Sequence, residues 1–71
     1  GIRDVNSIPM VQKILSEDND ISTRISAVRA LLRIDGANAI QALLVARNTG
    51  DSSDRVNQEI VTALQQLGID D

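Results

Sequence analysis

Apolar residues recur every three or four positions along most of this chain, the spacing that places them on one face of a helix. No stretch of useful length shows the two-residue alternation of a half-buried strand. The first expected helix covers about residues 8–17, after a lead-in over residues 1–6, with Ser7 as its N-cap and Pro9 in its first turn. Its inward-facing positions are Ile8, Val11, Ile14 and Leu15.

A second, longer helix is expected over about residues 21–34. Asp18 or Asp20 can cap its start, where a negative charge is also favourable. Gly36 is expected to stop this helix in the left-handed conformation. The broad apolar stripe of the helix consists of Ile21, Ile25, Ala27, Val28, Ala30, Leu31, Leu32 and Ile34.

Two further helices are expected over about residues 37–48 and 54–67, with a turn around Gly50 between them. Gly68 should end the last helix, and the three final residues should fray. Val45 is apolar but should point away from the core. The expected inward positions are Ala39, Ile40, Leu43, Leu44 and Ala46, followed by Val56, Ile60, Val61, Ala63, Leu64 and Leu67. The pattern therefore predicts an all-α chain of four short helices.

The second half of the chain repeats the first half at a shift of 33 residues. The matched pairs are Asp18 with Asp51, Val28 with Val61, Ala30 with Ala63, Leu31 with Leu64, and Ile34 with Leu67. The first helix of each half matches at a shift of 32, which one residue of slack in the turn explains. The sequence thus predicts a single domain over residues 1–71 that contains two stacked antiparallel helical hairpins, about 6–36 and 37–69.

Several residues of the first hairpin form an ordered set, with an acidic turn, an early arginine, spaced alanines and a final glycine. They are Asp18-Asn19-Asp20-Ile21-Ser22-Thr23-Arg24, then Ala27, Ala30-Leu31 and Gly36. This set resembles the HEAT-like repeat of phycobilisome lyases and many bacterial scaffolds, and the resemblance implies a fragment of an α-α superhelix. The second half departs from the pattern at Asn57, where the family favours arginine, and at Ile60, where it favours alanine.

Other helical architectures of similar size fit less well. The tetratricopeptide pattern needs aromatic residues and the ankyrin pattern needs Thr-Pro-Leu-His, and neither occurs in this chain. A four-helix bundle without true repeats remains the main rival.

The resemblance also implies which surface is available to a partner, because second helices line the concave face of such stacks. That face would carry Ser22, Ser26, Arg29 and Arg33 from the first hairpin, and Arg55, Glu59, Thr62 and Gln66 from the second. Arg29 and Arg33 lie four residues apart and would project together, so they could engage an acidic or phosphorylated protein segment. A solvated face that only keeps the protein soluble is the simpler alternative.

Arg24 is expected to have a structural role. The matching arginine of the family bonds acidic residues of turns and ties neighbouring repeats together, which implies Asp18 or Asp51 as its partner here. A calcium loop beginning at Asp18 is excluded, because Thr23 and Arg29 stand where such a loop needs glycine and glutamate.

Composition argues against several classes of function. The chain has no His and no Cys to act as catalytic base, nucleophile or zinc ligand, so we expect no enzymatic activity, no metal site and no cofactor. A net charge of −3 and the absence of aromatic residues argue against nucleic-acid binding. No apolar run reaches the roughly 18 residues of a membrane span. The lack of cysteine fits any compartment, with the cytoplasm as first choice.

Two hairpins leave a stack with unfinished ends, since repeats of this type normally need at least about three copies. The chain begins with glycine instead of methionine, which fits a processed product or one piece of a larger protein. We therefore expect either flanking repeats or a homo-oligomer, and a non-enzymatic protein-interaction or scaffold module. Two alternatives stay open: an accessory fragment of a phycobilin lyase-like enzyme subunit, and a small bundle that serves only to oligomerise.

Overall fold

A computed structural model describes residues 5–69, and its regular structure is helical throughout that range. A short 3₁₀ turn (Val5–Ser7) precedes four α-helices: α1 (Ile8–Glu17), α2 (Ile21–Ile34), α3 (Ala37–Thr49) and α4 (Asp54–Gln66). The predicted all-α class with four short helices is confirmed, and each predicted helix boundary lies within one residue of the observed one. The parts of the expected lead-in and of the expected frayed end that fall on residues 1–4 and 70–71 lie outside the described residues.

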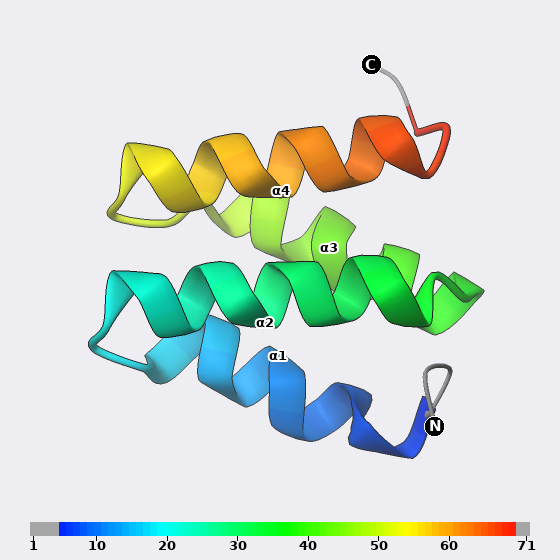
Figure 1. Ribbon diagram of the computed structural model, residues 1–71, viewed down its shortest axis with the longest axis horizontal. Helices are drawn as coiled ribbons and strands as arrows, with labels where there is room; N and C mark the ends of the chain where they lie inside the picture. Colours follow the sequence, from blue (N-terminus) through cyan, green and yellow to red (C-terminus); the bar gives the residue numbers. More distant parts are fainter. Residues whose placement is uncertain (1–4, 70–71) are drawn as a thin grey trace.

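The four helices form two antiparallel hairpins, α1–α2 and α3–α4 (Figure 1). α2 packs against each of the other three helices, and α1 also packs against α3. α2 and α4 lie side by side and run in the same direction, with α3 behind them (Figure 1). α2 is therefore the central helix, and it shares one layer of the structure with α4.

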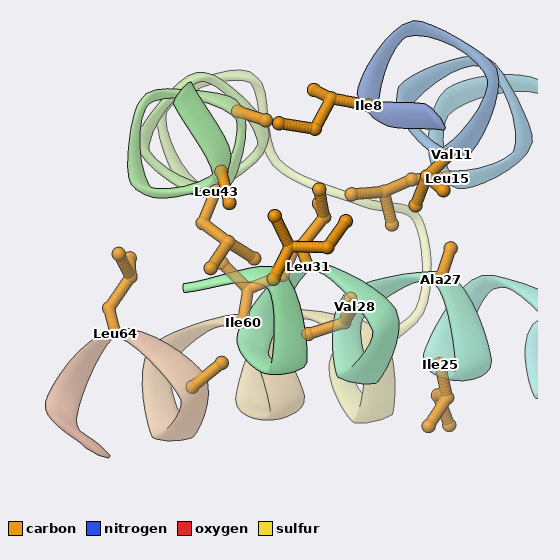
Figure 2. Close-up of a cluster of buried hydrophobic side chains, with 14 of the residues drawn as sticks. Ile8, Val11, Leu15, Ile25, Ala27, Val28, Leu31, Leu43, Ile60 and Leu64 are labelled. Atoms are coloured by element: carbon orange, nitrogen blue, oxygen red, sulfur yellow. The ribbon is translucent and has the colours of Figure 1, made fainter. Parts of the chain in front are cut away.

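The core lies between the helices and is built from aliphatic side chains alone. Figure 2 shows Leu31 and Leu43 pointing into it from different helices, and both residues are 0% exposed. Ala42 is also buried, although the sequence pattern did not include it. Val45 points outward as predicted, with 47% of its surface exposed. Ile21 was expected to face inward but is 38% exposed, because it occupies the first position of α2.

Other expected core positions lie only half-buried at the rim. These are Ile14, Ala30, Leu32, Ile40, Leu44, Ala46, Val61 and Leu67. The short helices explain this, because a pair of hairpins covers only part of each apolar stripe.

The end of α2 differs from the prediction at Gly36. The left-handed residue is Asp35, with φ 53°, whereas Gly36 is extended at φ −81° and ψ 174°. Gly36 is the N-cap of α3, and its carbonyl accepts the N–H of Ile40 at 2.9 Å. Asp tolerates the left-handed conformation better than most residues, so α2 ends at Ile34 as predicted, but the left-handed residue after it is Asp35 and not Gly36.

The end of α4 follows the prediction at Gly68 and corrects it at Ile69. Gly68 has φ 83°, and its N–H donates to the carbonyl of Gln65 at 3.0 Å. The N–H of Ile69 reaches back to the carbonyl of Leu64 at 2.9 Å. This pair of bonds is a Schellman motif. Ile69 also packs against the core, so it does not fray.

The first two helices begin at the predicted N-cap residues, but the predicted capping hydrogen bonds are not made. Ser7 and Asp20 are the N-caps of α1 and α2, but neither side chain bonds a backbone N–H of its helix. The Asp20 carboxylate instead accepts the hydroxyl of Thr23 at 2.8 Å. The Asp18 carboxylate accepts the backbone N–H of Asp20 at 2.9 Å, which closes the turn before α2.

Candidate functional site

A groove runs between the parallel helices α2 and α4 on their outer side, and it encloses about 410 Å³. Its apolar floor is formed by buried Val28 and Ala63 and half-buried Leu32. Its polar rim contains five of the residues expected on the concave face: Arg29, Arg33, Glu59, Thr62 and Gln66. We call this surface the α2–α4 groove.

An ion pair crosses the α2–α4 groove. The Nε and Nη2 groups of Arg29 donate to the two carboxylate oxygens of Glu59 at 3.3 and 3.2 Å. The pair lies near solvent, since the side chains are 65% and 32% exposed. Hydrogen bonds from Arg29 to Glu59, and the charge of that carboxylate, raise the pKa of Arg29 above its ordinary value. The sequence pattern gave no sign of this pairing, because it joins helices 30 residues apart.

Arg33 is the other cation at the rim. It is exposed, and within residues 5–69 no ion pair or hydrogen bond of its guanidinium is present. Arg33 was expected to act together with Arg29, but the structure gives the two arginines different surroundings. Arg29 is held by Glu59, whereas Arg33 can accept an anion without displacing another residue.

Three residues expected on the concave face do not line the groove. Ser22 and Arg55 lie in the first turns of α2 and α4, and Ser26 is exposed one turn further along α2. The groove extends only along the later turns of both helices. The apolar character of the floor residues predicts that they face the core and not a partner. Among them, only Leu32, at the edge of the apolar stripe, could have been predicted to be partly exposed.

Arg24 forms the most buried polar cluster that the structure describes. The residue is 8% exposed, although it carries a full charge. Its Nε and Nη2 groups donate to the two carboxylate oxygens of Asp51 at 3.0 and 3.1 Å. Its Nη1 group donates to the backbone carbonyl of Asp18 at 2.7 Å. Arg24 therefore joins the α1–α2 turn to the α3–α4 turn, and Asp18 contributes its backbone instead of its carboxylate.

The two turns are closed by bonds at matching positions. In the second turn, the side chain of Asn57 donates to the carbonyl of Asp51 at 2.8 Å and accepts the N–H of that residue at 2.7 Å. The Asp51 carboxylate also accepts the N–H of Ser53 at 2.8 Å. Asn57 thus contacts the carbonyl of its turn as Arg24 does in the first turn, but its shorter side chain reaches no further.

The described residues hold no group of three or more metal-ligating side chains. Across the same part of the chain, none of the helices is long and apolar enough to cross a membrane. Comparisons with family models, curated proteins and solved structures find no match to this chain. What the chain does must therefore be inferred from its own surfaces, of which the α2–α4 groove has the best-defined chemistry.

Proposed function

We propose that this chain is a non-enzymatic protein-interaction module of the HEAT-like repeat type. In this proposal the α2–α4 groove binds an acidic segment of a partner protein. The observation that carries it is the groove itself, in which the apolar floor of Val28, Leu32 and Ala63 lies beside the guanidinium of Arg33, which is unpaired within residues 5–69. Protein-binding surfaces commonly combine a buried apolar centre with such a polar rim.

The side-by-side arrangement of α2 and α4 supports the repeat part of the proposal. Stacked hairpins place second helices in one layer, which is where these two helices lie. The matching bonds to Asp18 and Asp51, 33 residues apart, support it further. A bundle of unrelated helices has no reason to close two turns in the same way.

The charges of the rim favour an anionic ligand over a cationic one. Arg29 and Arg33 stand against a single carboxylate, that of Glu59, although the chain as a whole carries a net charge of −3. Arginine binds carboxylates through parallel N–H bonds, which an acidic segment can accept. Glu59 competes for Arg29, so it should limit the affinity of such a ligand.

Because Glu59 competes with the ligand for Arg29, two substitutions in the groove should change the affinity for an acidic peptide in opposite directions. We expect Arg33→Gln to weaken binding of a fluorescein-labelled Asp- and Glu-rich peptide roughly three- to tenfold, because it removes the available cation. We expect Glu59→Gln to strengthen binding roughly two- to threefold, because it releases Arg29 and removes a like charge. Fluorescence anisotropy titrations at low and physiological salt measure both changes.

Arg55→Gln is the matched control, because it removes the same charge from an exposed position on α4 outside the groove. An Arg55→Gln effect as large as that of Arg33→Gln would mean that only net charge matters. Absence of peptide binding, or equal affinity in all variants, would refute the groove as the binding site.

A further inference from the structure

The outer face of α1 is a second surface with unusual exposure. Met10 is 63% exposed, and Ile14 beside it is only half-buried. A hollow of about 280 Å³ lies on this face. It is lined solely by α1 and the turn that follows, through Met10, Lys13, Ile14, Glu17 and Asp18. We call this surface the α1 face.

The α1 face matches the surface on which α1 itself packs within the molecule. A hollow of about 250 Å³ lies where α1 meets α3. On the α3 side it is lined by Ala42, Val45, Ala46, Thr49 and Gly50. Counting back 32 residues, the shift that relates the first helices, gives the five residues of the α1 face in the same order. The α1 face is therefore the counterpart of a surface that receives a helix.

The helix that would pack on the α1 face can be identified by the same shift of 32 residues. On the α1 side, the joint with α3 uses Gln12, Leu15 and Ser16. Their counterparts 32 residues later are Leu44, Arg47 and Asn48 on α3, none of which is fully buried. We propose that a second copy of this chain docks head to tail, with these three α3 residues placed on the α1 face.

Charge complementarity supports a second copy as the occupant. Within the molecule, Leu15 lies in the same hollow as Thr49 and Gly50, whose counterparts 32 residues earlier are Glu17 and Asp18. In the docked copy, Arg47 takes the place of Leu15, and the corresponding neighbours are Glu17 and Asp18. An arginine thus meets two carboxylates at this position, while Leu44 lies close to the apolar part of Met10 and Ile14.

The joint between copies should be weaker than the joint within one molecule. Arg24 crosses the internal joint to Asp51, but its counterpart Asn57 is too short to reach the Asp18 of a second copy. The contact is also heterologous, because each copy uses two different surfaces, so association can continue without closing into a dimer. This inference rests on the stacked-hairpin arrangement in the proposed function, but it uses neither the α2–α4 groove nor its ligand.

The first test is the mass of the wild-type chain as a function of concentration. Sedimentation equilibrium from low micromolar to millimolar concentration should show a weight-average mass that rises continuously. A monomer at all concentrations, or a plateau at the mass of a dimer, would overturn head-to-tail docking.

The second test mixes two variants that each lose one surface. Met10→Arg places a positive charge opposite the apolar side chain of Leu44, and Arg47→Glu places a negative charge opposite Glu17. Each variant alone should remain monomeric. An equimolar mixture should form a one-to-one dimer that cannot grow further. In this dimer the α3 residues of Met10→Arg dock on the intact α1 face of Arg47→Glu.

Ser22→Arg is the control, since it adds the same charge as Met10→Arg at an exposed position on α2, and it should associate like the wild type. If circular dichroism shows that Arg47→Glu does not fold, Asn48→Glu replaces it, because Asn48 is exposed and belongs to the same surface. A mixture that stays monomeric overturns the proposal. A chain that stays monomeric but binds the acidic peptide overturns this inference alone, and an associating chain that ignores the peptide overturns only the groove.

Discussion

Replacing Arg24 tests whether one buried ion pair holds the two hairpins together. In Arg24→Met the volume of the side chain is largely kept, but both bonds to Asp51 and the bond to the Asp18 carbonyl are lost. The side chains of Arg24 and Asp51 are only 10% and 13% exposed. The carboxylate of Asp51 would therefore remain largely buried without a countercharge.

The expected cost follows from the surroundings of that carboxylate. Removing one partner of a buried ion pair commonly costs about 3–5 kcal/mol. Asp51 keeps its bond from the N–H of Ser53 and retains some solvent contact, so we expect the lower figure of about 2–3 kcal/mol. A domain of this length has a total stability of roughly 4–10 kcal/mol. Arg24→Met should therefore remove a large share of the stability without unfolding the chain completely.

The pair itself is measured by a double-mutant cycle with Asp51→Asn. Asparagine keeps an oxygen for the N–H of Ser53 but loses the charge that attracts Arg24. We expect each single variant to cost about 2–3 kcal/mol and the double variant no more than one of them, which gives a coupling of about 2 kcal/mol. Urea unfolding must be followed by far-UV circular dichroism, because the chain contains no aromatic residue.

Arg24→Lys serves as a conservative variant, because lysine keeps the charge but cannot make the paired bonds to Asp51. It should lie between wild type and Arg24→Met. Single-variant costs that simply add in the double variant, with a coupling below about 0.5 kcal/mol, would show that the two side chains act independently. The ion pair would then not be the link between the hairpins.

Four further predictions concern positions where burial or backbone conformation decides the outcome. Leu31→Ala should cost about 2–5 kcal/mol because Leu31 is completely buried, whereas Val45→Ala at an exposed position should change stability by less than about 0.5 kcal/mol; urea midpoints compare the two. Gly36→Ala should change the free energy of unfolding by less than about 1 kcal/mol in either direction, because the entropy gained at an ordinary negative φ with open space at the Cβ is offset by alanine being a poorer N-cap of α3 than glycine, and a larger shift in a thermal scan would contradict this. Gly50→Ala should cost about 1–3 kcal/mol in the same thermal scan, because its φ of 78° with ψ 146° is essentially restricted to glycine. Arg29→Gln should leave the urea midpoint unchanged, because its ion pair is exposed, and a clear loss of stability would show that the groove pair is structural.

The helices could be predicted from the sequence because their signals are local. Each apolar stripe follows the helical period, and acidic or glycine-rich turns separate the stripes. The error at Gly36 was also local. A glycine after a helix usually marks the left-handed stop, but here Asp35 adopts that conformation and the glycine begins the next helix.

The groove could be predicted only in part, because it depends on how two helices are offset along their axes. The sequence indicated which residues share a face of α2 or α4, and five of those eight line the groove. It could not indicate that Arg29 meets Glu59, since the 33-residue shift aligns Arg29 with Thr62 instead. Neighbouring helices in a layer are in contact at staggered positions, and that stagger is set by the packing of the whole core.

The difference between Arg24 and Asn57 determines how the two hairpins can be extended. Both side chains donate to the carbonyl of the aspartate that opens their own turn, so either residue is sufficient for a closed turn. Only the arginine is long enough to bind the carboxylate of a following turn as well. The first hairpin is therefore joined to the second by a buried ion pair, while the second hairpin lacks the group that would bind a third in the same way. Asn57→Arg should restore that group, and it should strengthen head-to-tail association by giving the Asp18 carboxylate of the next copy a partner. Sedimentation equilibrium should compare Asn57→Arg with the double variant Asn57→Arg/Asp18→Asn. If the double variant associates as strongly as Asn57→Arg alone, the new arginine does not bind the Asp18 carboxylate of the next copy.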